Sequence, residues 1–434
     1  MINVLRRPWK KERTMDTSNH TDVLRIATAG SVDDGKSTLI GRLLFETNSI
    51  ASDKLSAIEE SSKRKGLNYT DLSLLTDGLV AEREQGITID VAHIYFSTPN
   101  RKFIIADTPG HIEYTRNMVT GASNADVSII LVDARNGLLE QTKRHLYISQ
   151  LLKVPKIIVC INKMDLVDYS EDRFHSIVND FRALLSDEEF AGLSIDFIPV
   201  SSLRGENVST DSELMPWYKG ANLLHLLENF QLGSSEKTDS ARFPVQLVIR
   251  PKTKDYHDFR GYAGKVASGV FKPGDSVRVL PSGEEASIKA IWKYDALLER
   301  ADEDDSIILE LDRDVDISRG NMLVKELAFG GVQELASKIC WLDHSSLNIG
   351  KTYILQHGIN ESKVKVTSIN YKVDAASFLK DETADSLQIN DIGQIRLRSA
   401  KPIMIDKYAE NRKNGAFILV DEYSNNTVAV GFAV

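Results

Sequence analysis

The chain has 434 residues, which is too long for one compact core and suggests two to four domains. Hydrophobic residues make up 42% of it and charged residues 26%, and no apolar run approaches the roughly 18 residues that would cross a bilayer. The formal net charge of -9 argues against a dedicated nucleic-acid-binding protein, although a local basic patch would escape this average. We therefore expect a multidomain protein that binds neither a membrane nor nucleic acid.

The N-terminal segment and the two cysteines bear on location. The stretch MINVLRRPWKKERT is rich in basic side chains but has no apolar core of a signal peptide. We predict a disordered tail over residues 1–22, with Met15 as an alternative start. Cys160 and Cys340 lie far apart and outside any C-x-x-C pattern, which predicts neither a disulfide framework nor a cysteine zinc site. A reducing cytoplasm is the expected location.

In chain order, the first half alternates short apolar runs with polar helical stretches, which is the pattern of a doubly wound α/β sheet. A helix is predicted at 38–46, and the amphipathic stretch GANLLHLLENF at 220–230 closes a domain that spans residues 23–232. Ligands of such sheets bind outside the carboxyl ends of the strands, where the polar loops begin. The predicted buried strands lie at residues 24–30, 102–110, 126–134, 156–165 and 195–202.

The second half has a different pattern. After a polar linker at residues 233–242, short β-rich runs are separated by turn sequences such as KPGD and LPSG. We place one small antiparallel β-barrel at 243–330 and a second at 331–434, with the break near Gly330 and Gly331. The predicted fold class is an α/β domain with a mostly parallel, doubly wound sheet, followed by two small antiparallel β-barrel domains.

The stretch GSVDDGKS follows the first strand, opens the first helix and fits the P-loop pattern G-x-x-x-x-G-K-[ST]. In such a loop the backbone N–H groups face phosphates, Lys36 reaches the β and γ groups, and Ser37 offers its hydroxyl to Mg²⁺. The carboxylates of Asp33 and Asp34 could serve local hydrogen bonding or place a cation or a switch segment, and both roles stay open. The predicted phosphate-binding residues are Gly30, Ser31, Val32, Asp33, Asp34, Gly35, Lys36, Ser37 and Thr38.

Two further loops carry groups that suit a nucleotide. In DTPGH, residues 107–111, Asp107 can hold Mg²⁺ through water and the N–H of Gly110 can meet the γ-phosphate. In NKMD, residues 162–165, the carboxylate of Asp165 can pair with the N–H groups of guanine, which adenine cannot match. Three such loops in this order, after three strands of one sheet, predict a site for GTP and Mg²⁺.

The elements GSVDDGKS, GITI, DTPGH, NKMD and SSL resemble the GTPases of the translation-factor superfamily. The resemblance implies that Thr88 closes over Mg²⁺ and the γ-phosphate, and that His111 orients the hydrolytic water once a partner has organised the switches. A surface histidine at a helix start is the alternative for His111. Around guanine, the resemblance implies that Asn162 and Asp165 select the base and that Lys163 lies along it. It also implies a loop of Ser201, Ser202 and Leu203, in which the backbone of Ser202 meets the guanine oxygen.

Two features of the hydrolytic machinery stay open in the sequence. Arg83 and Arg116 lie in suggestive segments, but neither can be assigned as an arginine finger. The segment from Asn48 to Thr88 is the candidate switch, whose order would depend on the γ-phosphate. We therefore expect slow hydrolysis by the isolated chain and faster hydrolysis in a complex.

Longer blocks are more specific than these loops. Asp34 stands where carriers such as elongation factor Tu usually have His, and blocks such as GSVDDGKSTLIGRLL and TDGLVAEREQGITIDVA resemble the large, GTP-hydrolysing subunits of bacterial sulfate adenylyltransferases. The resemblance covers essentially everything after residue 22, although HIYF at 93–96 departs from the usual pattern. It implies that GTP hydrolysis is coupled to the synthesis of adenylylsulfate and pyrophosphate from ATP and sulfate. A separate small subunit would transfer the adenylyl group, in a heterodimer or higher assembly.

The alternative is an elongation factor-like GTPase that carries aminoacyl-tRNA. Such a carrier would share every predicted nucleotide ligand, so these residues cannot exclude it. Residues 241–434 contain 26 basic and 28 acidic side chains, which argues mildly against an RNA-binding surface in the β region. We expect no nucleic-acid partner.

Overall fold

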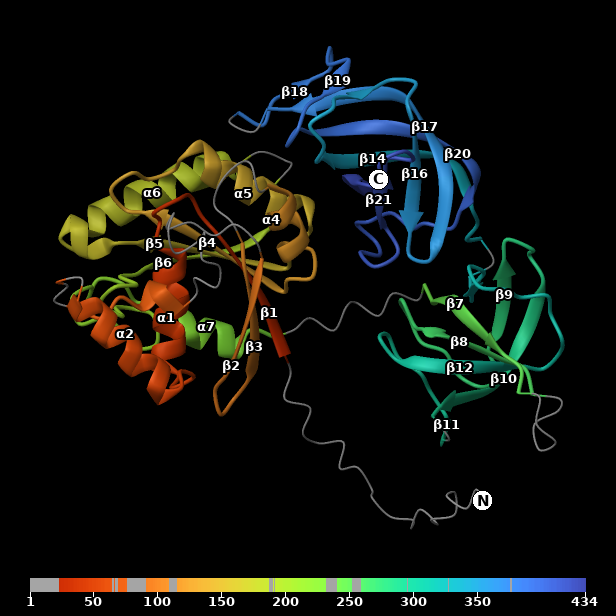
Figure 1. The fold of residues 1–434 in the computed structure, drawn as a ribbon, viewed down its shortest axis with the longest axis horizontal. Helices are drawn as coiled ribbons and strands as arrows, with labels where there is room; N and C mark the ends of the chain where they lie inside the picture. Colours follow the sequence, from red (N-terminus) through yellow and green to blue (C-terminus); the bar gives the residue numbers. More distant parts are fainter. Residues whose placement is uncertain are drawn as a thin grey trace, which may run out of the picture.

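The computed structural model describes residues 23–434 except 65, 67–68, 76–90, 109–114, 187–189, 191, 232–239, 252–258, 295, 327 and 375–376. Its strands form three main sheets in three consecutive parts of the chain, which we call the first, second and third domains (Figure 1). Helices cover the sheet of the first domain, and the other two domains are built around antiparallel strands. Within the described residues, no helix is both long and apolar enough to span a membrane.

The first domain contains a six-stranded sheet with the order β2-β3-β1-β4-β5-β6. Only β2 runs antiparallel to its neighbour, which confirms the predicted mostly parallel sheet. The edge strand β2 was not predicted, since it is short and only Phe96 of its six residues is fully buried. The strands are β1 (Val23–Ala29), β2 (Ala92–Ser97), β3 (Lys102–Asp107), β4 (Val127–Asp133), β5 (Lys156–Asn162) and β6 (Ser194–Pro199).

Two hydrophobic cores lie on opposite faces of this sheet. In β4, Ile129 and Leu131 join the core under α1 and α7, whereas Ile130 and Val132 join the core under α4, α5 and α6. Because helices cover both faces, β4 is buried along its whole length. The helices are α1 (Lys36–Glu46), α2 (Ser52–Arg64), α4 (Thr115–Ala122), α5 (Glu140–Leu151), α6 (Glu171–Leu184) and α7 (Leu223–Asn229), with 3-10 turns η1 (Leu72–Leu75) and η3 (Met164–Val167).

The second and third domains are closed antiparallel barrels, as predicted. In the second, β9 pairs with β10 and closes the order β11-β10-β12-β8-β7-β13-β9; in the third, β16 pairs with β17 and closes β16-β21-β22-β14-β20-β17. The predicted break at 330–331 falls between β13 and β14, and the domain boundaries themselves stay predictions. The strands are β7 (Arg242–Ile249), β8 (Gly261–Lys265), β9 (Ser276–Leu280), β10 (Glu285–Lys293), β11 (Ala296–Leu298), β12 (Ser306–Leu311), β13 (Met322–Val324), β14 (Val332–Trp341), β15 (Leu347–Asn348), β16 (Thr352–His357), β17 (Asn360–Val373), β18 (Lys380–Asp381), β19 (Ser386–Leu387), β20 (Ile392–Ile403), β21 (Ala416–Val420) and β22 (Thr427–Ala433).

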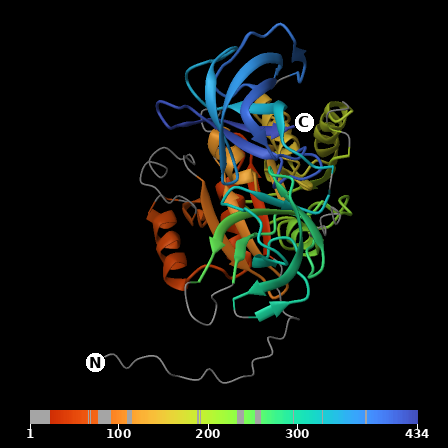
Figure 2. The ribbon, with the colours of Figure 1, turned by 90° about the vertical axis from the view of Figure 1, so that its right-hand side faces the viewer.

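The third domain packs against the helices α4 and α5 of the first (Figures 1 and 2). Apolar side chains of the third domain, including Leu342 and Phe432, belong to the same hydrophobic core as Tyr147 of α5. The hydroxyl of Tyr408 donates a hydrogen bond to the carbonyl of Leu152 at 2.9 Å. The face of the sheet that carries α4 and α5 is therefore covered by a second layer of structure.

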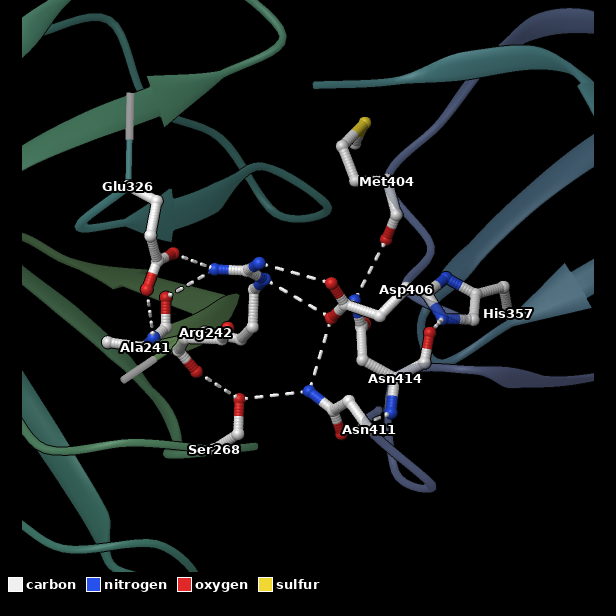
Figure 3. A network of polar contacts seen from close by, with 10 residues as sticks. Ala241, Arg242, Ser268, Glu326, His357, Met404, Asp406, Asn411 and Asn414 are labelled. Atoms are coloured by element: carbon white, nitrogen blue, oxygen red, sulfur yellow. Dashed lines mark hydrogen bonds and ion pairs between the residues drawn. The ribbon is translucent and has the colours of Figure 1, made fainter. Parts of the chain in front are cut away.

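A buried arginine joins the second domain to the third (Figure 3). Arg242 is the last residue of the predicted linker and the first residue of β7, and it is only 3% exposed. Its guanidinium meets the carboxylate of Asp406 with N–O distances of 3.1 and 3.2 Å, pairs with Glu326, and lies 3.7 Å from the ring centre of Phe329. The amide of Asn414 donates to the same Asp406 carboxylate at 2.8 Å. The junction thus depends on buried charges that satisfy one another.

We predict that Arg242→Met lowers the thermal unfolding midpoint strongly, because it leaves the buried Asp406 carboxylate without its cation, a loss of about 3 kcal/mol or more. Calorimetry measures the midpoint. The matched control is Arg300→Met, since the pair of Arg300 with Asp302 is exposed to solvent and such a pair contributes little to stability. Equal shifts in the two variants would show that the Arg242 contacts do not stabilise the junction.

Candidate functional site

The P-loop lies between β1 and α1, at the carboxyl edge of the sheet. Val32 and Asp33 form its exposed tip, whereas Lys36 is buried and donates to the carbonyls of Gly30 at 2.8 Å and Ser31 at 3.2 Å. Burial lowers the pKa of Lys36, and the nearby Asp107 carboxylate opposes this effect. The helix begins at Lys36, so Ser37 and Thr38 lie in its first turn, where backbone N–H groups have no partner within the helix.

The carboxylate of Asp34 ties the loop to itself. It is 2% exposed, and its Oδ2 accepts a hydrogen bond from the backbone N–H of Ser31 at 2.7 Å. Burial raises the pKa of this carboxyl group, while the Ser31 N–H and Lys36 act in the opposite direction. Of the two roles left open for Asp34, the geometry supports local hydrogen bonding.

Gly35 is the residue that brings the P-loop against the loop after β5. Its φ is 95°, and a Cβ there would lie 2.5 Å from Nδ2 of Asn162, so no other residue fits without displacing that amide. The same Nδ2 donates to the carbonyl of Asp34 at 2.7 Å. Because a trans peptide places its C=O and N–H on opposite sides, the N–H of Gly35 points away from Asn162. This orientation leaves the N–H available to an anion on the other side of the loop.

The loops after β5 and β6 are joined by hydrogen bonds. Oδ1 of Asn162 accepts from the backbone N–H and the hydroxyl of Ser202, both at 2.9 Å. The hydroxyl of Ser201 donates to Oδ1 of Asp165 at 2.6 Å. Asn162 therefore holds the P-loop with its amide nitrogen and the SSL loop with its oxygen. Among the described residues, no donor meets the second carboxylate oxygen of Asp165, which leaves it available to a ligand.

Asp107 ends β3 beside the P-loop strand. It pairs in register with Thr28 of β1, whose hydroxyl donates to Oδ1 of Asp107 at 3.1 Å, and it is 1% exposed. The other predicted groups for the γ-phosphate and the catalytic water, namely Thr88, Gly110 and His111, lie outside the described residues. Their roles stay predictions.

The described residues fit a magnesium nucleotide. The fit rests on a buried ammonium at Lys36, the first-turn N–H groups of α1 and the hydroxyl of Ser37. In addition, the buried hydroxyl oxygen Oγ of Ser31 has no hydrogen-bond partner within the described part of the chain. A phosphate oxygen could accept from it. Asp107 and Ser37 supply the oxygen ligands that Mg²⁺ prefers.

One arginine that contacts the guanine loop was not predicted from the sequence. Arg42 of α1 was missed; its Nε donates to the carbonyl of Ser202 at 3.1 Å, and its Nη2 bonds to the carbonyl of Leu203. No sequence motif marks a position six residues after Lys36 as one that contacts the loop after β6.

Arg116 faces away from the P-loop, because its Nη2 donates to the third-domain carbonyls of Leu342 at 2.9 Å and Thr427 at 3.2 Å. Arg83 lies outside the described residues.

The end of β4 also carries charged residues that the motif analysis did not include. Asp133 is 2% exposed and pairs with Lys163 at 3.0 Å and with Arg135 at 2.6 Å. Burial alone would raise the pKa of Asp133, but the hydrogen bonds from Arg135 and Lys163 lower it to about 2. A signal for Asp133 was present, since the strand DVSIILVDA ends at the same edge as the predicted ligands.

Comparison with known proteins assigns the first and the third domain to families. Residues 21–236 match the elongation factor Tu GTP binding domain, and residues 334–434 match the GTP-eEF1A C-terminal domain-like family. The chain is 45% identical over 97% of its length to sulfate adenylyltransferase subunit 1 of Bacteroides fragilis, covering 87% of that protein. It is 46% identical to the protein of the same name from Cronobacter sakazakii, with 97% and 88% covered.

A longer relative shows the same similarity. The bifunctional enzyme CysN/CysC of Mycobacterium tuberculosis is 45% identical over 416 residues, which are 95% of this chain and 67% of that protein. With sequence identity this high along nearly the whole chain, a P-loop at the carboxyl edge of a doubly wound sheet and two closed barrels after it, the chain belongs to the family of sulfate adenylyltransferase subunit 1, a branch of the elongation factor Tu-like GTPases.

Proposed function

We propose that this chain is the GTP-hydrolysing subunit of a sulfate adenylyltransferase. In this role it couples GTP hydrolysis to the synthesis of adenylylsulfate and pyrophosphate from ATP and sulfate. The observation that carries the proposal is the identity of about 45% with proteins named sulfate adenylyltransferase subunit 1 over almost the whole chain. The preorganised P-loop and the paired loops after β5 and β6 support it.

The residues of the site divide the work. The P-loop N–H groups and Lys36 bind and neutralise the phosphates, and the carboxylate of Asp165 accepts from guanine. Ser37, Thr88 and Asp107 would hold Mg²⁺, which would supply positive charge beside the γ-phosphate. The side chain of His111 orients the attacking water. The contacts of Asn162 with Asp34 and Ser202 support this division, because they hold the phosphate and base subsites at a fixed separation.

The proposal includes a partner, the small catalytic subunit that binds ATP and sulfate, in a heterodimer or higher assembly. Coupling requires that the GTP and GDP states of this chain bind the reaction states of the partner with different free energies. The segment from Asn48 to Thr88 is the proposed switch, and it contains α2 and η1. We propose a cytoplasmic location for the assembly. The two free cysteines, Cys160 and Cys340, support it, because thiols stay reduced in the cytoplasm.

The first test is steady-state GTP hydrolysis by this chain with its small subunit, with and without ATP plus sulfate, while pyrophosphate release is followed. We expect GTP turnover to rise when both substrates are present and pyrophosphate release to depend on GTP, since GTP hydrolysis drives the synthesis of adenylylsulfate. The control is the same mixture with ATP but no sulfate. If an intact complex shows neither response, coupling is wrong, and salt-dependent binding of aminoacyl-tRNA would then favour the carrier.

A further inference from the structure

The buried carboxylate at the end of β4 is linked to the P-loop through one lysine. Asp133 accepts from the ammonium of Lys163 at 3.0 Å, and that ammonium also donates to the backbone carbonyl of Asp33 in the P-loop. Lys163 has a positive φ of 62°, as does Asp33 with 65°, so both ends of this contact hold an uncommon backbone conformation. We call the contact from Asp133 through Lys163 to the Asp33 carbonyl the Asp133–Lys163 bridge.

Arg135 supplies most of the hydrogen-bond donors to the Asp133 carboxylate. Its Nε lies 3.0 Å from Oδ1, its Nη2 lies 2.6 Å from Oδ2, and its backbone N–H donates to Oδ1 at 2.9 Å. The Arg135 side chain is itself 49% exposed. A buried carboxylate is costly unless several donors satisfy it, and here one residue supplies most of them. Asp133 therefore stays ionised while its remaining interaction is directed at Lys163.

We propose that Asp133 is a positioning residue for nucleotide binding, because it holds Lys163 against the Asp33 carbonyl and so fixes the P-loop. This inference rests on the proposed GTP site. A lysine side chain has a flexible four-carbon stem, and a second anchor reduces the ways in which it can leave the loop. With Asn162 holding the next carbonyl, that of Asp34, two successive P-loop carbonyls are restrained from the same side.

The bridge does not include Asp165, the residue proposed to distinguish guanine from xanthine. Loss of the carboxylate frees Lys163 and lets the Asp33 peptide rotate, which misaligns the N–H groups that face the phosphates. The effect should therefore be the same for guanine and xanthine nucleotides. It should appear mainly as faster nucleotide dissociation, since the contacts that hold a bound ligand determine its off-rate.

The test compares Asp133→Asn with the unchanged chain by stopped-flow dissociation of a fluorescent GDP analogue. We expect the dissociation rate to rise about tenfold or more, because a buried charge pair is broken. Asp126→Asn is the matched control: Asp126 precedes β4 at the opposite end of the same strand and accepts from the N–H of Arg25 at 2.8 Å. It should leave the dissociation rate unchanged.

Two further variants separate positioning from a general structural role. In a Lys163→Met background, Asp133→Asn should add little, since the bridge is already broken and the two effects are coupled. Arg135→Met should raise the rate less than about threefold, because the Asp133–Lys163 contact remains. An unchanged rate in Asp133→Asn, additive effects in the double variant, or an equal effect of Arg135→Met would overturn the inference. If the unchanged chain retains no guanine nucleotide at all, the proposed function fails first.

Discussion

Replacing Lys36 with alanine should reduce GTP turnover at least about a hundredfold, because the variant removes the only buried ammonium that contacts the P-loop within the described residues. The ammonium of Lys36 donates to the carbonyls of Gly30 and Ser31, which holds it at the loop. Calorimetric titration with GTP and steady-state phosphate release measure binding and turnover separately. Loss of both is expected if Lys36 contacts the β and γ groups in the ground state and the transition state.

Lys407→Ala provides the control for this variant. Lys407 lies in the third domain with a side chain that is 64% exposed, and its contact with Glu410 at 3.9 Å is a surface pair. It should change neither GTP binding nor turnover. Wild-type turnover in Lys36→Ala would remove the P-loop from the proposed hydrolytic site.

Asp165→Asn should weaken GTP binding by about a hundredfold or more and relax the preference toward xanthine nucleotides. The carboxylate can accept two hydrogen bonds from guanine, each of which is worth roughly 1.5–3 kcal/mol when the acceptor is charged. An asparagine keeps the contact with Ser201, since Oδ1 can still accept from that hydroxyl, but it presents an amide donor that suits the extra oxygen of xanthine. Competition of GTP and XTP against a fluorescent GDP analogue measures the change.

The matched control for Asp165→Asn is Asp168→Asn, three residues further along the same loop. Asp168 is exposed and has a φ of 52°, which asparagine tolerates as well as aspartate does. We expect the base preference of the Asp168→Asn variant to equal that of the unchanged chain. An Asp165→Asn variant that still prefers guanine strictly would contradict the assignment of Asp165 as the base selector.

The two carboxylates of the P-loop illustrate how far the sequence could be taken. Spacing alone showed that Asp33 and Asp34 need not touch phosphate, but it did not separate their roles. In the structure Asp34 is buried and bonds to Ser31, whereas Asp33 is exposed and contributes its carbonyl to Lys163. The difference depends on which way each side chain leaves the loop, and this depends on the positive φ at Asp33 and Gly35.

Contacts between distant segments were beyond the sequence. Arg116 follows DTPGH closely enough to suggest a catalytic role, yet it donates to carbonyls at Leu342 and Thr427. Arg242 is the last residue of the predicted linker, and it joins two barrels through Asp406. A carbonyl can be an acceptor at any residue, so no residue type marks these partners in advance. Only the packing of one domain on another decides them.

The sequence by itself determined the fold class and the family, and it predicted the residues that would bind phosphate and guanine. It did so because strands buried on both faces have long apolar runs, and because a loop that wraps phosphate needs glycine, lysine and serine at set spacings. The tertiary structure alone decided that Asp133 meets Lys163, that Arg42 holds the loop after β6, and that the third domain covers α4 and α5. These contacts join residues that are far apart along the chain, and their geometry follows from the order of strands in the sheets and the way the domains pack.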